Sequence, residues 1–472
     1  MIKKTIITLF LTIVSLAAFS QQCNCTVNFE ALIKQVTENY PGFPDKITPV
    51  KNKAFRNLTD SLRKAAISAG ETTCFRIMDK WIQFFDDLHL GVVLNSQPAS
   101  AAFIRAVFEG EQKIPLQRDS LVKRYSTYGI KDPMEGIWQM DGGNFEVAIV
   151  RMQNSNTFAG VTLKADSLFW MPGQVKFTLH PLGNKKYRVV FKSKQHTTEE
   201  SNVVLQPETG ILKIDDSRWV KTLPVTGVRK PEEQLSFYFK ELDSQTNVLR
   251  LSSFLLDFKG LVDSIIGANM TAITGKPYLI VDVRDNKGGY NIAFEKLLPL
   301  LYTKPVISSG IKILATPDNI ALYEGLLTNN NIDSLQRQKI AELIRQLKEK
   351  KNGYLVEEDE VYKQDTIYRY PQKIAILVNE KSASSTEHLV LKAKQSSKCV
   401  IMGHRTAGII DYTNIVGPRS LPCNHYLLYC PTGKSNRLPL HPIDNIGIAP
   451  DVVISDLEAD WIATAARELK NH

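Results

Sequence analysis

The chain is poor in several residue types whose abundance would define a fold class. Six cysteines in 472 residues are too few for a disulfide-rich miniature scaffold. Glycine and proline, at 26 and 22 residues, are too sparse for a collagenous or low-complexity chain. The net charge of +9 is spread along the chain without a run of five basic residues, so we expect no nucleic-acid partner.

Motifs for metals and nucleotides are also missing. The sequence has neither a Cys-x-x-Cys pair nor a His-Glu-x-x-His motif, the spacings that commonly hold zinc. Gly-x-Gly-x-x-Gly is absent, and Leu428 stands where a P-loop ending in Gly433-Lys434-Ser435 needs its first glycine. We therefore expect no metal and no organic cofactor.

The N-terminus has the pattern of a secretory signal peptide. Lys3 and Lys4 precede an apolar run over residues 6–19, and small residues, Ala18 and Ser20, stand at the −3 and −1 positions of a cut after Ser20. The run is shorter than a membrane span, although an uncleaved anchor remains the alternative. Residues 1–20 thus predict an exported chain, periplasmic or secreted, without stable membrane insertion after cleavage.

Export permits disulfides, and the spacing of the cysteines leaves their pairing open. Cys423 and Cys430 flank a short apolar segment and could close a hairpin. Either Cys23 or Cys25 could reach Cys74.

The hydrophobic pattern divides the mature chain into three parts and predicts an α+β multidomain fold. Residues 21–130 read as helical, including an amphipathic helix over 74–88 that could end at Gly91. Residues 134–225 alternate between apolar and polar side chains, which predicts an antiparallel, β-barrel-like domain. Residues 235–472 alternate strands with helices as in an α/β core, and a polar helix over 333–351 marks an inserted excursion near 316–355.

Two segments of the core carry possible chemistry. The strand ending at Asp282 runs into a turn with Gly288 and Gly289, which lets backbone N–H groups face a ligand, or is simply a tight turn. Ser384 opens a helix, where a hydroxyl lies beside free N–H donors. There it can serve as a nucleophile or, because Glu387 follows three residues later, as the cap of a capping box.

Four segments in order, DVRDNKGG, SASSTE, GHRTAG and GIAPD, resemble the C-terminal-processing (tail-specific) serine peptidase family, which includes the tricorn protease core. The resemblance covers roughly residues 240–465, and the helical N-terminal part fits it as well. The family often carries a PDZ module, which the β-rich middle of this chain does not resemble. The implied activity is that of a serine endopeptidase acting on a peptide or protein substrate.

The resemblance also implies roles for individual residues. Ser384 would be the nucleophile, and the N–H groups of Ser385 and of Gly288 or Gly289 would bind the oxyanion. The processing branch has its lysine base where this chain has Ile409, whereas the tricorn-like branch takes a histidine after an apolar helix, which matches His89. Asp444 matches that branch's carboxylate, so the expected arrangement is Ser384, His89 and Asp444.

Other groups could replace these residues, and other functions could use the same cleft. His388, His404 and His441 are alternative bases in the same part of the chain, and Lys392 and Lys394 follow Ser384 on one predicted helix. A non-catalytic peptide- or ligand-binding protein and an esterase remain alternative functions.

Overall fold

The structure is a computed structural model of the chain. It describes residues 23–96, 99–140, 145–165, 168–183, 186–204, 210–214, 217–224, 237–329, 332–455, 458 and 460–471. The predicted signal peptide, residues 1–20, lies outside the described residues.

The N-terminal part is a helical layer with one short strand. Its elements are α1 Cys25–Asn39, α2 Phe43–Lys46, α3 Pro49–Ile67, α4 Glu71–Ile82, η1 Gln83–Phe85, β1 Gly91–Leu94, α5 Ala101–Val107 and α6 Arg118–Tyr128. Side-chain caps start several helices: Asn24 for α1, Thr48 for α3 and Ser100 for α5 each accept a backbone N–H of the first turn. Trp81 and Phe85 are fully buried and pack edge to face, 5.1 Å between ring centroids.

The predicted helix over 74–88 ends earlier than Gly91. The last helical turn closes at Phe85, and Asp86 takes a left-handed conformation with φ 49°. Gly91 instead begins β1, which pairs antiparallel with β21, Tyr426–Tyr429, from the far end of the chain. The turn between Asp86 and Gly91 therefore lies at the junction of the N-terminal and C-terminal parts.

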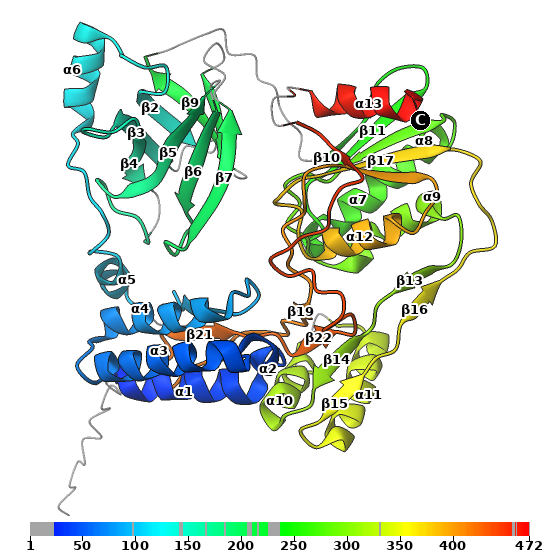
Figure 1. Ribbon diagram of the computed structural model, residues 1–472, viewed down its shortest axis with the longest axis horizontal. Coiled ribbons are helices and arrows are strands. Elements are labelled where there is room, and N and C mark those ends of the chain that lie inside the picture. The colour runs from blue at the N-terminus through cyan, green and yellow to red at the C-terminus, as the bar shows by residue number, and fades with distance from the viewer. Residues whose placement is uncertain are drawn as a thin grey trace, which may run out of the picture.

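The middle part is a curled antiparallel sheet of eight strands. They are β2 Gly136–Met140, β3 Phe145–Arg151, β4 Phe158–Ala165, β5 Val175–Gly183, β6 Lys186–Lys192, β7 Thr198–Val204, β8 Ile211–Ile214 and β9 Ser217–Leu223. The sheet order is β7-β6-β5-β4-β3-β2-β9-β8, so the first strand pairs with the last and the sheet curls on itself, upper left in Figure 1. Its inner face is filled by large side chains such as Trp138, Phe177 and Trp219, as in small barrels.

The C-terminal core is built on a six-stranded sheet of order β10-β11-β12-β17-β18-β23. Its strands are β10 Phe237–Glu241, β11 Thr246–Leu251, β12 Tyr278–Asp282, β17 Lys373–Val378, β18 Cys399–Gly403 and β23 Val452–Val453, and all neighbours from β11 to β23 are parallel. Both faces of the sheet are covered, as parallel sheets require. One face packs against α7 Leu256–Ala268, η2 Asn291–Leu297, α9 Leu298–Leu301 and α12 Ser385–Ala393, and the other against α13 Trp461–Asn471.

The remaining elements of the core are short. The helix α8 spans Met270–Ile273, and two more strands are β19 Tyr412–Thr413 and β20 Arg419–Ser420. The predicted excursion contributes β13 Val306–Ser308, β14 Ile311–Leu314, α10 Pro317–Leu326, α11 Ser334–Lys350, β15 Tyr354–Val356 and β16 Glu360–Tyr362. It joins β22, Gly433–Ser435, and β19 in a four-stranded sheet.

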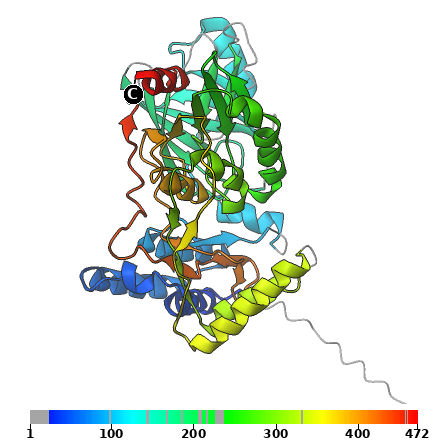
Figure 2. The same ribbon diagram turned by 90° about the vertical axis from the view of Figure 1, so that its right-hand side faces the viewer.

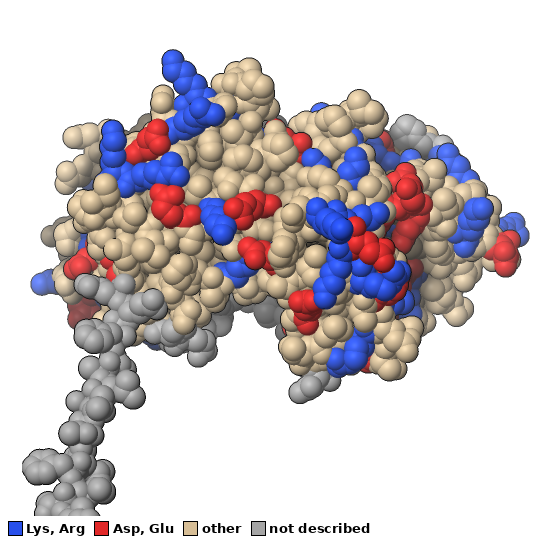
Figure 3. All heavy atoms as spheres, turned by 90° about the horizontal axis from the view of Figure 1, so that it is seen from below, with Lys and Arg blue, Asp and Glu red and all other residues tan. Residues whose placement is uncertain are grey.

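The excursion reaches the N-terminal helices. Thr316 contacts Asn39 at 2.5 Å through their side chains, and Gln35 donates to Asp318 at 2.9 Å. Figure 2 shows α11, the yellow helix, at the bottom of the molecule on the level of the blue N-terminal helices. The face seen from below in Figure 3 carries basic and acidic side chains interspersed.

Two disulfides join distant parts of the chain. Cys25 pairs with Cys74, one of the pairings that the sequence left open. Cys423 pairs with Cys23 across 400 residues and not with Cys430, which is a free, buried thiol. Within the described residues, no helix combines the length and the apolar character that crossing a membrane requires.

Candidate active site

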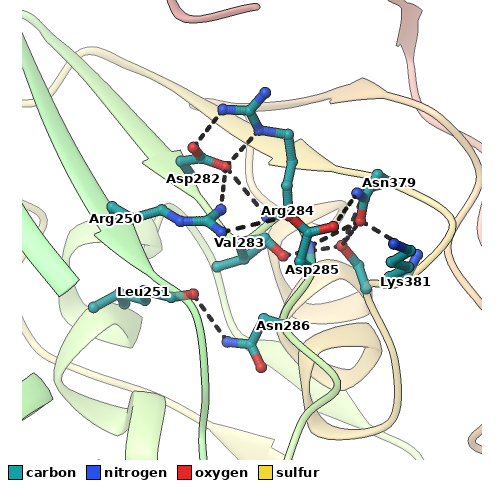
Figure 4. Close-up of polar contacts among 10 residues, drawn as sticks. Arg250, Leu251, Asp282, Val283, Arg284, Asp285, Asn286, Asn379 and Lys381 are labelled. Carbon is teal, nitrogen blue, oxygen red and sulfur yellow. Dashed lines mark hydrogen bonds and ion pairs between the residues drawn. The ribbon is translucent and has the colours of Figure 1, made fainter. Parts of the chain in front are cut away.

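Two turns at one edge of the core sheet are joined by polar contacts. Because β12 and β17 are parallel neighbours, with Asp282 opposite Leu377, the segments that follow them leave the sheet at the same edge. Asp285 N–H donates to Asn379 Oδ1 at 2.9 Å, and Asn379 Nδ2 donates back to Asp285 at 2.8 Å (Figure 4). Ser382 Oγ donates to the Val283 carbonyl at 2.9 Å.

A buried ion pair anchors the first of these turns. Asp282 accepts hydrogen bonds from Arg250 at 2.8 Å and from Arg284 at 2.7 Å (Figure 4). Burial alone would raise the pKa of Asp282, but the two guanidinium groups outweigh burial and lower it. Asp282 therefore serves as an ionised anchor for the turn.

Gly288 lies directly against the predicted nucleophile. Its φ is +91°, and a Cβ at this position would be 2.8 Å from Ser384 Cβ and 2.8 Å from Ser385 N. Any side chain here would push into the start of α12. The turn is thus more than a local chain reversal, because its backbone forms one wall of the Ser384 site.

Ser384 has the most exposed hydroxyl of its cluster and a strained backbone. Ser382 and Ser385 are 0% and 2% exposed, whereas Ser384 is partly exposed. Its φ of 56° and ψ of −120° lie in a region that non-glycine residues rarely adopt. Such a conformation at the entry of a helix presents the side chain outward, where the helix dipole favours negative charge.

The capping alternative is partly realised. Glu387 accepts the N–H of Ser384 at 3.0 Å, which is one arm of the predicted capping box. The helix start is of the capping-box type, in which the Ser384 hydroxyl faces the N–H of Glu387. That N–H donates to the Ser384 carbonyl at 2.8 Å, and within the described residues no separate cap hydrogen bond to the hydroxyl occurs. Both roles, cap and nucleophile, therefore stay open for this hydroxyl.

The predicted oxyanion donors differ in availability. Gly288 N–H donates to Asn286 Oδ1 at 2.9 Å. Gly289 N–H and Ser385 N–H have no acceptor among the described residues. Of the two glycines that the sequence left open, Gly288 lies against Ser384 and Gly289 has the unused N–H, so the choice between them stays a prediction.

His89 points one ring nitrogen at a backbone carbonyl. Its Nδ1 lies 2.7 Å from the Tyr412 carbonyl oxygen, and its own N–H donates to Asp87 at 2.8 Å. A carbonyl only accepts, so Nδ1 carries the proton and Nε2 is left with a lone pair. This is the tautomer that a general base needs.

His388, an alternative base, lies on α12. The pKa of His388, four residues after Ser384, is lowered to about 4, first by burial and then by the charges of Arg437, Lys392 and His89. His388 is therefore neutral at pH 7. Among the described residues, no hydrogen bond joins His89 to Ser384 or to another residue of α12.

Asp444 and His89 have hydrogen-bond partners other than each other in the structure. The hydrogen bond of His89 Nδ1 goes to Tyr412, and no hydrogen bond between Asp444 and His89 occurs among the described residues. Asp444 Oδ1 instead accepts the N–H groups of Ile410 at 2.8 Å and Asp411 at 2.7 Å. Sequence patterns could not show this, because Tyr412 acts through its main chain.

Asp411 and Asp444 hold each other's backbone. Asp411 Oδ2 accepts the N–H groups of Ile443 at 2.6 Å and Asp444 at 2.8 Å, and Arg437 donates to Oδ1 at 2.8 Å. Burial raises the pKa of Asp444 to about 7, and the nearby Asp87 and Asp411 contribute in the same direction. This pair fixes the segment that presents the Tyr412 carbonyl to His89.

Most of the alternative bases are engaged elsewhere. His404 contacts Glu380 through Nδ1 at 3.2 Å and the Ile454 carbonyl through Nε2 at 2.9 Å. Lys392 donates to Ser308 and Lys394 to Asp451. His441 is exposed.

One trio of potential metal ligands occurs among the described residues, namely Cys23, Cys423 and His425. Its two sulfur atoms are joined to each other in a disulfide, so neither is a thiolate. This trio does not fit a metal ion as it stands.

Comparison with known proteins gives a family for part of the chain. Residues 245–454 match the model of peptidase family S41. No curated protein matches the chain.

Three solved structures illustrate the structural similarity. Mature CPAF complexed with lactacystin is 13% identical, with a TM-score of 0.47 over 91% of this chain and 94% of that one. The photosystem II D1 C-terminal processing protease is 14% identical, with a TM-score of 0.38 over 92% and 93%. The tricorn protease is 12% identical, with a TM-score of 0.38 over 95% of this chain and 37% of its own. Identities and TM-scores this low transfer no residue's role to this chain.

Proposed function

We propose that this chain is a serine peptidase of family S41, with Ser384 as the nucleophile and His89 as the general base; the match of residues 245–454 to the model of that family supports the proposal. The observation that carries the proposal is the state of His89. Its Nδ1 proton is held by the Tyr412 carbonyl at 2.7 Å, which leaves Nε2 free to accept a proton.

The reaction follows from these groups. Ser384 Oγ attacks the scissile carbonyl while its proton passes to His89 Nε2. The carbonyl oxygen becomes an oxyanion, which the N–H groups of Ser385 and Gly289 stabilise at the positive end of α12. His89 then protonates the leaving amine, and water, activated by the same nitrogen, hydrolyses the acyl-enzyme.

Tyr412 and Asp444 act as positioning groups in this scheme. The carbonyl of Tyr412 selects the tautomer of His89, a role that a carboxylate has in the Ser-His-Asp triad. Asp444 holds the backbone of Ile410 and Asp411, immediately before Tyr412. No metal or organic cofactor takes part.

We also propose that the chain is exported. Two disulfides, Cys23–Cys423 and Cys25–Cys74, support this proposal because such bonds persist in oxidising compartments. The pattern of residues 1–20 supports it independently.

A serine-directed phosphonate probe tests the proposed nucleophile. The wild-type chain should be labelled, and Ser384→Ala should abolish labelling while circular dichroism shows an unchanged fold. The matched controls Ser382→Ala and Ser385→Ala alter neighbouring hydroxyls of the same motif. Labelling that survives in Ser384→Ala but vanishes in either control would show that the wrong serine is assigned.

A substrate comparison then separates the enzymatic alternatives. A peptide library and a set of simple esters are offered to the wild-type chain, and we expect turnover of peptides. Turnover of esters alone would point to an esterase. A chain that is neither labelled nor active would support a non-catalytic binding protein on this fold.

A further inference from the structure

We propose that Glu387 is a positioning residue that ties the Ser384 turn to the segment 406–412. The effect that we expect on catalysis rests on the proposed function. The side chain is 0% exposed. A charged group is rarely buried to this extent unless it is paired or fully hydrogen-bonded.

Both carboxylate oxygens of Glu387 are fully used. Oε1 accepts from Thr406 Oγ1 at 2.6 Å and from Gly408 N at 2.8 Å. Oε2 accepts from Ser384 N at 3.0 Å and from Ile409 N at 2.8 Å. One side chain thus takes one donor from the nucleophile and three from a segment about twenty residues further along the chain.

Three of the four donors are backbone N–H groups, which cannot accept a hydrogen bond. Burial raises the pKa of Glu387, and the four donors offset part of that rise. The Thr406 hydroxyl can also accept, so it is the one partner to which a protonated carboxyl could donate. Both protonation states therefore keep the three N–H contacts that join the two segments.

The tied segment leads directly to the base. Three residues after Ile409 comes Tyr412, whose carbonyl holds His89 Nδ1 at 2.7 Å. A chain of three residues spans at most about 11 Å. Glu387 therefore connects the backbone of the nucleophile to the group that orients the base.

A capping role alone does not account for this arrangement. Of the two hydrogen bonds in a capping box, only one, from the N-cap N–H, goes to the carboxylate of the third helical residue. Three of the four bonds to Glu387 instead come from outside the helix. Ala407 N–H, which donates to the Ser382 carbonyl at 2.9 Å, adds a backbone contact between the same two segments.

Glu387→Gln is the first test. A glutamine places its NH₂ group where one oxygen was, so either Gly408 or Ile409 loses its acceptor whichever way the amide turns. We expect kcat to fall about 10²-fold, because a displacement near 1 Å can cost that much, while KM changes less than about threefold. A role in stability alone would lower the melting temperature and leave kcat of the folded enzyme unchanged.

Glu380→Gln is the matched control. Glu380 precedes the same turn and also bonds a side chain, His404, at 3.2 Å, but among the described residues no hydrogen bond joins its side chain to Ser384 or to the segment 406–412. We expect its kcat to remain within about threefold of the wild type. Thr406→Val, which removes one of the four donors with little change of shape, serves if Glu387→Gln does not fold, and should lower kcat about five- to tenfold at constant KM.

Amide hydrogen exchange tests the link without relying on catalysis. In the wild type the N–H groups of Ser384, Gly408 and Ile409 should exchange slowly, and in Glu387→Gln the peptide covering 404–412 should exchange faster. Unchanged exchange together with kcat within threefold of the wild type would overturn the proposal. If the wild type shows no turnover or labelling, the proposed function fails, and the exchange data still decide whether Glu387 joins the two segments.

Discussion

Asp444→Asn distinguishes two roles that a buried aspartate near an active site can have. Where a triad aspartate binds the histidine, this change favours the wrong tautomer and costs about 10⁴-fold in kcat. Here both hydrogen bonds to Asp444 converge on Oδ1, from Ile410 N at 2.8 Å and Asp411 N at 2.7 Å. Asparagine keeps that oxygen as an acceptor. Exchanging a charged for a neutral acceptor weakens the bonds by about 1 kcal/mol, so kcat should fall less than about tenfold.

The same substitution has a predicted effect on stability that depends on pH. The folded pKa of Asp444 is about 7, and the unfolded value is about 3.9. Below pH ~4 the carboxyl is protonated in both states. Between pH ~4 and ~7 the Asp444 carboxyl ionises only in the unfolded chain. The wild type therefore loses up to about 4 kcal/mol of stability over this range, and above it the loss stays constant. Asparagine does not titrate and avoids this loss.

Two measurements check this prediction. Unfolding by urea at pH 5 and pH 8 should show the stability of Asp444→Asn, relative to wild type, rising by up to about 3 kcal/mol between the two values. Steady-state kinetics at pH 8 should give the small loss in kcat. A folded Asp444→Asn variant with a loss of 10³-fold or more would refute the positioning role and restore the triad aspartate. A stability difference that does not change with pH would refute the raised pKa.

The remaining predictions concern Gly288, whose backbone lines the Ser384 site, and the proposed base His89. Gly288→Ala should lower kcat at least about 10²-fold, because its Cβ would lie 2.6 Å from the Ala383 carbonyl oxygen. The control is Gly260→Ala, on the exposed face of α7, where an added Cβ would have no heavy atom within 4 Å. This variant should keep full activity and be more stable than the wild type by about 0.5–1 kcal/mol. Equal kinetics of the two variants would place the Gly288 turn outside the site. His89→Ala should lose about 10³-fold or more in kcat. The kcat of His404→Ala should stay within about tenfold of the wild-type value. Near-normal turnover of His89→Ala would exclude His89 as the base.

Much of the core architecture could be predicted from local patterns. Period-two alternation over residues 134–225 predicted the antiparallel strands of the middle part, and alternating strands and helices over 235–472 predicted the α/β core. Burial on one face of a strand and burial on both faces give different apolar spacings, so both could be read from the sequence. The turn after Asp282 and the helix after Ser384 followed from glycines and capping residues. The end of the helix over 74–88 was placed too late because Asp86, a non-glycine residue, takes the left-handed conformation at which the helix stops.

The contacts between distant segments could not be predicted in the same way. The orienting group of His89 is a carbonyl, which every residue possesses, so no residue type marks Tyr412. The spacing Ser384-x-x-Glu387 predicted a local cap, and nothing in it points to Thr406, Gly408 or Ile409. The pairing of Cys423 with Cys23 was likewise invisible, because spacing favoured the nearer Cys430.

The placement of His89 depends on the docking of two parts of the chain that are far apart in sequence. His89 lies in the turn before β1, and β1 pairs with β21 in the C-terminal part, with Gly91 opposite Tyr429. The disulfide Cys23–Cys423 joins the start of the helical layer to the segment just before β21. Asn445 adds a third connection, since its side chain donates to the Asp86 carbonyl at 2.7 Å. The base and the nucleophile therefore belong to different parts of the chain, and their relative position depends on the contacts that hold the helical layer to the core.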